Sequence, residues 1–130
     1  MKTPDSILKY EAALAPALAD IAMLLRENIE KSLPKATSKV WHGHPVWFDG
    51  ENPLVGYDAR KASVNILFWN GKKLGEEGLV PVGKYRAAGK KYEQASDVNL
   101  VELRRCLKKA RLNVFDGVTY FKKLRAAAKA

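Results

Sequence analysis

The stretch ASVNILFW, residues 62–69, is followed at once by the pair Asn70-Gly71. Its β-branched and aromatic residues favour a strand, and an Asn-Gly pair is typical of the turn that ends one. Side chains alternate along a strand, which places Val64, Ile66 and Phe68 on one face and the residues between them, with Trp69, on the other. This segment is the strongest strand signal in the chain, and it predicts a sheet.

Shorter β-prone runs lie before and after this strand. They cover residues 39–41, 46–48, 54–57 and 88–93. Gly43, Pro45 and the turn pair Asp49-Gly50 separate the first three of these runs. Residues 72–86 contain scattered glycines and a proline, and they are predicted to form a loop with little regular structure.

An amphipathic helix is predicted on each side of the strands. Apolar residues recur every three or four positions at Leu14, Leu18, Ile21, Leu25 and Ile29. Pro16 should interrupt the chain between this helix, residues 17–32, and a preceding one that ends near residue 13. Ser96 is the predicted N-cap of the second long helix, residues 97–112, whose apolar side holds Leu103 and Leu107.

The order of elements predicts an α+β fold. Two long helices should pack on one face of an antiparallel sheet, and a basic helix should follow at the C-terminus. The 130 residues are expected to form a single domain, 1–130. Residues 1–13 are interpreted as an N-terminal helical extension and residues 113–130 as a C-terminal basic helical extension.

The net charge of +9 lies wholly in the second half of the chain. Residues 1–65 carry 8 basic and 8 acidic side chains, whereas residues 66–130 carry 15 basic and 6 acidic ones. Such a field attracts polyanions, although excess lysine also serves solubility alone. The polar side of the second long helix gathers Arg104, Arg105, Lys108, Lys109 and Arg111. One alternative is therefore a non-specific nucleic-acid accessory protein that uses this face.

Other observations bear on class and location. No apolar run reaches the ~20 residues that span a bilayer, and no signal peptide is recognisable, so we expect no membrane partner and a cytoplasmic location. Cys106 is the only cysteine, and a buried, inert thiol is expected there. No nucleophile elbow, P-loop or dinucleotide-binding motif is present. We therefore expect a protein that is not an enzyme and that needs no cofactor.

His42 and His44 are the only histidines. On an extended strand, residues two apart point the same way, so these imidazoles could share a metal ion. Asp49, Asp58 or a glutamate would have to complete the site, if the fold brings one of them close. The alternative is a structural or hydrogen-bonding role for both histidines.

Aromatic residues gather in the predicted strands: Trp41, Trp47, Phe48, Tyr57, Phe68 and Trp69. Because helices are expected on one face only, some of these rings should line the opposite, open face. That face would offer a platform for a ligand, a partner or stacked bases. Alternatively, the rings belong to the core or to a dimer interface.

Three motifs resemble the YdhG-like family of bacterial domains of unknown function. They are WHGHPVW at 41–47, VNILFWNGKKL at 64–74 and GKYR at 83–86, and the resemblance runs from about Pro16 to Ala110. It implies a frataxin-like two-layer sandwich. Some members are described as iron chaperones that bind iron through acidic side chains on the first helix and the nearby sheet edge. The acidic residues available there are Asp5, Glu11, Asp20, Glu27 and Glu30.

The leading hypothesis is a non-catalytic domain that binds a small anionic ligand or a protein partner. Its predicted site comprises Trp41, His44, Trp47, Trp69, Lys84 and Arg86. The guanidinium of Arg86 would suit a carboxylate or a phosphate. The alternatives are an iron chaperone that uses His42, His44 and nearby acids, and weak polyanion binding through the basic second half.

Overall fold

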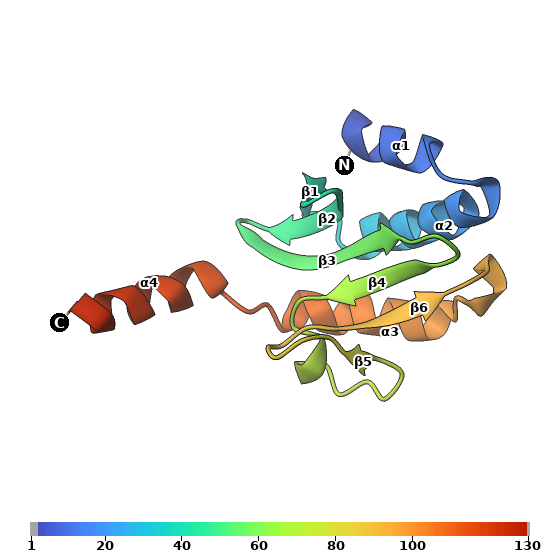
Figure 1. The fold of residues 1–130 in the computed structure, drawn as a ribbon. Helices are drawn as coiled ribbons and strands as arrows, with labels where there is room; N and C mark the ends of the chain where they lie inside the picture. The colour runs from blue at the N-terminus through green and yellow to red at the C-terminus, as the bar shows by residue number, and fades with distance from the viewer. Residues whose placement is uncertain (1–2, 130) are drawn as a thin grey trace.

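The computed structural model describes residues 3–129. Within them six antiparallel strands form one sheet, and two of the helices pack on one of its faces (Figure 1). The strands are β1 (Thr37–Trp41), β2 (His44–Asp49), β3 (Asn52–Ala59), β4 (Val64–Phe68), β5 (Val80–Pro81) and β6 (Ala88–Tyr92). The helices are α1 (Asp5–Ala12), α2 (Pro16–Ser32), α3 (Leu100–Leu112) and α4 (Gly117–Lys129). The sheet order is β1-β2-β3-β4-β6-β5. The predicted α+β class with an antiparallel sheet is confirmed.

The region predicted to be a loop with little regular structure contains one short strand. β5 pairs with β6 through Val80 opposite Gly89 and Pro81 opposite Ala88. The sequence gives little sign of this strand, because proline cannot donate to a ladder and is tolerated only at a sheet edge. β5 is such an edge, and its two residues agree with the prediction of little regular structure over 72–86.

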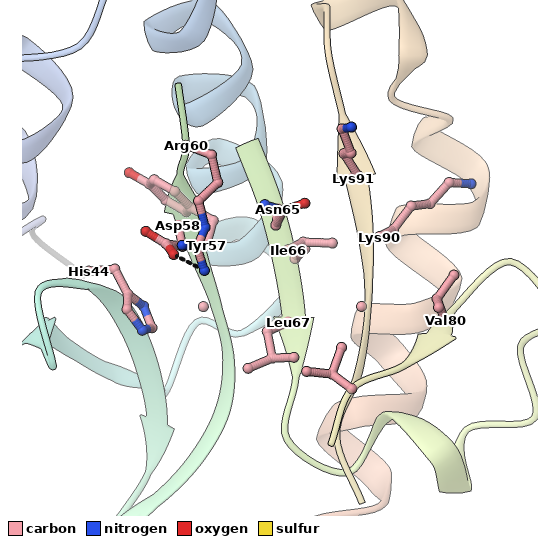
Figure 2. A pocket seen from close by; sticks show the side chains of 13 residues that line it. His44, Tyr57, Asp58, Arg60, Asn65, Ile66, Leu67, Val80, Lys90 and Lys91 are labelled. Carbon is pink, nitrogen blue, oxygen red and sulfur yellow. Dashed lines mark ion pairs between the residues drawn. The ribbon is translucent and has the colours of Figure 1, made fainter. Parts of the chain in front are cut away.

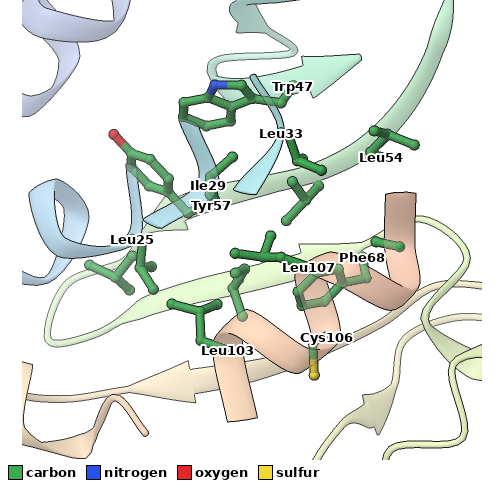
Figure 3. Packing of buried hydrophobic residues seen from close by; sticks show 14 of the residues in the cluster. Leu25, Ile29, Leu33, Trp47, Leu54, Tyr57, Phe68, Leu103, Cys106 and Leu107 are labelled. Carbon is green, nitrogen blue, oxygen red and sulfur yellow. The ribbon is translucent and has the colours of Figure 1, made fainter. Parts of the chain in front are cut away.

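α2 and α3 lie side by side over one face of the sheet and enclose the core with it (Figures 1 and 3). Ile21, Leu25 and Ile29 are fully buried on α2, which confirms the predicted rotation of this helix. Leu103 and Leu107 meet them from α3. Cys106 is buried beside these leucines, as predicted, and burial raises the pKa of its thiol to about 11.

The helix boundaries follow local chemistry. A helix begins again at Pro16, as predicted. Proline is tolerated at the first helical position because an N–H there would have no partner within the helix. α3 starts later than predicted: Asn99, not Ser96, is its N-cap, and the Asn99 side chain accepts a hydrogen bond from the Glu102 amide at 3.0 Å. The buried Val98 is extended, which delays the helix.

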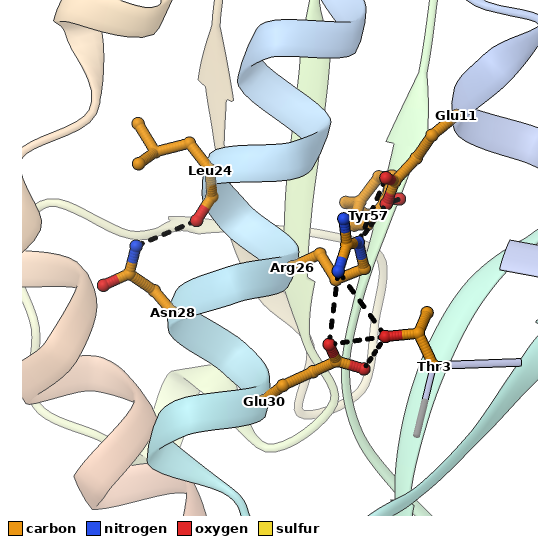
Figure 4. Close-up of polar contacts among 7 residues, drawn as sticks. All are labelled: Thr3, Glu11, Leu24, Arg26, Asn28, Glu30 and Tyr57. Carbon is orange, nitrogen blue, oxygen red and sulfur yellow. Dashed lines mark hydrogen bonds and ion pairs between the residues drawn. The ribbon is translucent and has the colours of Figure 1, made fainter. Parts of the chain in front are cut away.

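α1 is tied to the rest of the domain by a buried polar network (Figure 4). The Glu11 carboxylate accepts hydrogen bonds from Arg26 at 2.9 Å and from the Tyr57 hydroxyl at 2.6 Å. Arg26 also donates to Glu30, and Thr3 donates to the same carboxylate. Burial and the hydrogen bond to Glu11 raise the pKa of Tyr57. Beside this network, Ile7 of α1 is fully buried.

None of the helices within residues 3–129 has both the length and the hydropathy that a bilayer-crossing segment needs. α4 leaves the body of the molecule and projects away from the sheet (Figure 1).

Candidate functional site

The turn between β1 and β2 separates the two histidines. Trp41 pairs with His44, so His42 and Gly43 form a two-residue turn, and their φ angles are 53° and 85°. Positive φ at both positions is the geometry of a tight hairpin turn. His42 is therefore in the turn and not on an extended strand, and the premise that placed both imidazoles on one side of a strand was wrong. Among residues 3–129, no three His, Cys, Asp or Glu side chains gather as metal ligands.

Trp41, His44 and Trp69 come together on the sheet face opposite α2 and α3. The ring centroids of Trp41 and Trp69 are 6.2 Å apart, and the His44 ring is stacked at 6.4 Å from Trp69. Val46, two residues after His44 on β2 and therefore on the same face, is fully buried yet lies outside the main core. Three of the predicted site residues thus form one half-exposed aromatic platform.

Trp47 lies on the other face. It is fully buried in the core and packs against Tyr57, with ring centroids 6.0 Å apart. Strand alternation explains the difference, because neighbouring residues of β2 point to opposite sides of the sheet. Trp47 is therefore a core residue. Contrary to the prediction, it does not line the platform.

The open face of the sheet is hollowed beside this platform (Figure 2). The hollow has a volume of about 470 Å³, and we call it the open-face hollow. Gly56, Leu67 and Gly89 are paired side by side across β3, β4 and β6 and form its floor. A Cβ on Gly56 would lie 2.6 Å from the Pro45 carbonyl oxygen, so the close backbone approach requires glycine there. A Cβ on Gly89 would come within 2.2 Å of the Ile66 carbonyl oxygen, so no other residue fits there.

Polar side chains line one end of the open-face hollow. Asp58, Asn65 and Lys91 are opposite one another on the three strands. Arg60 donates to Asp58 at 3.0 Å and stays 68% exposed (Figure 2). Two cations against one carboxylate leave this end positive, which suits an anionic group. His44 lines the hollow from β2 (Figure 2), and its Nδ1 is a buried atom without a hydrogen-bond partner.

Lys84 and Arg86 are not part of the open-face hollow. Lys84 is exposed on the loop after β5. The guanidinium of Arg86 lies over the Phe115 ring at 3.9 Å and near Tyr120 at 5.6 Å, which are cation–π distances. The structure thus joins Arg86 to the segment before α4 and not to His44.

Sequence reasoning missed the residues that form the floor and the polar end of the hollow. Gly56 and Gly89 were a usable signal, since a glycine inside a strand often marks a place where something approaches the backbone closely. Arg60 and Lys91 carried no signal of their own. Only the pairing of β3, β4 and β6 brings these two residues to the same end of the hollow.

The predicted nucleic-acid face of α3 is partly neutralised. Glu76, in the loop before β5, accepts hydrogen bonds from Arg105 at 2.9 Å and from Lys109. Arg104 donates to Asn28 on α2 at 3.1 Å. Asn28 is neutral, so Arg104 keeps its charge, and Arg104, Lys108 and Arg111 are all exposed.

Replacing Glu76 should change how stability depends on pH. Hydrogen bonds from Arg105 and Lys109 lower the pKa of its carboxyl from 4.5 to about 2. Its contribution is complete above pH 4.5 and is lost as pH falls toward 2. Glu76→Gln should therefore destabilise the protein at neutral pH and flatten the decline on acidification. Urea unfolding across this pH range measures both effects.

Glu77→Gln is the matched control, since Glu77 is the exposed neighbour. Equal pH profiles for Glu76→Gln and the unmodified protein would contradict the prediction.

These elements define an α+β domain with an open sheet face, an aromatic platform and a hollow beside it. A solved structure with this fold is that of YdhG from Bacillus subtilis, a protein of the DUF1801 family. The two structures match with a TM-score of 0.62 over 83% of this chain and 90% of YdhG, at 13% sequence identity. The YdhG-like fold predicted from the motifs is thereby confirmed. No protein-family model and no curated protein matches the sequence.

Proposed function

We propose that the chain is a non-catalytic binding domain of YdhG-like type and that its ligand occupies the open-face hollow. The observation that carries this proposal is the hollow itself, with its glycine-flanked floor and its positive end. The ligand is a small molecule with an apolar body and a carboxylate or phosphate group. Leu67, Val80 and Val82 provide the apolar contact surface.

Arg60 and Lys91 are the groups that would meet the anion. Asp58 engages Nη2 of Arg60, which leaves other N–H donors of the guanidinium available. Lys91 is exposed, and its partner across the sheet is Asn65. A charged hydrogen bond formed at such a site contributes about 1.5–3 kcal/mol, so the loss of one cation should be readily measurable.

Titration with succinate and with inorganic phosphate, followed by NMR, tests the proposal. Both probes should shift the amide signals of Gly56, Leu67 and Gly89 more than those of the rest of the chain. Lys91→Glu should weaken binding by about tenfold or more, because it removes one favourable charge and adds an opposing one.

Lys84→Glu is the matched control, since it makes the same charge change on an exposed loop outside the hollow. The proposal fails if the chemical-shift changes spread evenly over the amide signals of all lysines. It also fails if Lys91→Glu and Lys84→Glu weaken binding equally.

The frataxin-like relation, iron binding and nucleic-acid binding stay predictions. A frataxin-like relation is supported by α2 and α3 on a single sheet face. Iron binding would have to use acids other than Glu11 and Glu30, which are engaged by Arg26. Non-specific nucleic-acid binding through α3 would rely mainly on Arg104, Lys108 and Arg111.

A further inference from the structure

A second hollow, of about 420 Å³, lies between the β2–β3 turn and the start of α4. Three aromatic rings line it, those of Trp69, Phe115 and Phe121. Arg125 and Glu51 add one charge of each sign to the lining. We call it the aromatic slot, and it is distinct from the open-face hollow, which shares no lining residue with it.

Contacts within the fold set the walls of the aromatic slot. Asn52, in the first position of β3, accepts a hydrogen bond from the Gly117 amide at 3.1 Å and donates to Asp116 at 3.5 Å. Asn70 donates to the Asn113 carbonyl oxygen at 2.7 Å. Arg86 covers the Phe115 ring. The start of α4 is therefore fixed against the sheet, and a ligand would find the rings already in place.

The charges on α4 extend the site beyond the slot. Within the described chain α4 carries Lys122, Lys123, Arg125 and Lys129 and no acidic residue. Phe121 is half-exposed, at 50%, so a planar group can reach its ring. Flat aromatic walls next to the Arg125 side chain match the two parts of a nucleotide, a base that stacks and a phosphate that pairs with a cation.

We propose that the aromatic slot binds a base of single-stranded nucleic acid and that the cations of α4 follow its phosphates. A single strand is favoured over a free nucleotide because Lys122 and Arg125, three residues apart on α4, are neighbours on the helix surface and can meet two successive phosphates. It is favoured over a duplex because only an unpaired base can leave its neighbours and stack between protein rings. This site is independent of the open-face hollow and of the basic face of α3.

Binding of a short dye-labelled oligothymidylate, measured by fluorescence anisotropy, tests this proposal. Phe121→Ala should weaken binding by about tenfold or more, since stacking on one ring is lost. Phe121→Trp should preserve it. Arg125→Gln should reduce the slope of log affinity against log salt by about 0.7, the value for one phosphate on a single strand.

Leu124→Ala is the matched control, because Leu124 is an equally exposed apolar residue on α4 that does not line the slot. Circular dichroism should show the same helix content in all variants. Lys91→Glu, in the open-face hollow, should leave strand binding unchanged apart from a uniform effect of charge.

Four results would overturn the proposal. They are equal loss of binding in Phe121→Ala and Leu124→Ala, equal affinity for AMP and for the strand, equal affinity for a duplex, and dimerisation of the free protein that Phe121→Ala abolishes. The last would show that a second copy of the chain covers the slot.

Discussion

Glu11→Ala should lower the free energy of unfolding by about 3–5 kcal/mol, the usual cost of removing one partner from a buried ion pair. The carboxylate is 5% exposed and holds both Arg26 and the Tyr57 hydroxyl. Without it, the guanidinium and the phenol would remain in a site that water hardly reaches. Urea denaturation at neutral pH, monitored by circular dichroism, measures the loss.

Two further variants locate the effect. Glu11→Gln keeps the shape of the side chain and can still accept from Tyr57, so its cost should be smaller. Thr3→Ala removes a hydrogen bond to Glu30 at the edge of the network and should cost about 0.5–1.5 kcal/mol. If Glu11→Ala costs no more than Thr3→Ala, the network does not hold α1 in place.

Leu25→Ala should destabilise the protein by about 2–5 kcal/mol, because the side chain is fully buried between α2, α3 and the sheet. The cost combines the lost transfer of apolar surface with the cavity left behind. Met23→Ala is the matched control on the same helix, since Met23 is 42% exposed. Denaturant midpoints compare the two. A loss below about 0.5 kcal/mol at Leu25 would be incompatible with this burial.

Local pattern predicted the parts of the fold that depend on neighbouring residues. The alternation of residues 62–69 and the spacing of Ile21, Leu25 and Ile29 were sufficient, because one periodic face meets one core. β5 and the late start of α3 depend on contacts made after folding. No local pattern predicts that Val80 pairs with β6 or that Val98 is buried in the core.

The candidate site was predictable only in part for the same reason. Strand alternation correctly separated Trp69 from Phe68, and Trp69 lies beside Trp41. Trp47, predicted for the same ligand site, is in the core. Which side of a strand faces the helices depends on the register of the whole sheet, and a shift of one residue exchanges the two sides. The pairing of Glu76 with Arg105 joins residues 29 positions apart, and neither segment contains a local pattern that predicts it.

The brevity of β5 limits how a polypeptide can be recognised at the open-face hollow. A binding partner that adds a strand to a sheet needs a row of free backbone donors and acceptors along an edge. β5 has two residues, and one of them, Pro81, has no N–H to offer. β-augmentation is therefore disfavoured along β5. A peptide that enters the hollow has to be selected by its side chains or by a terminal carboxylate, much as a small molecule would be.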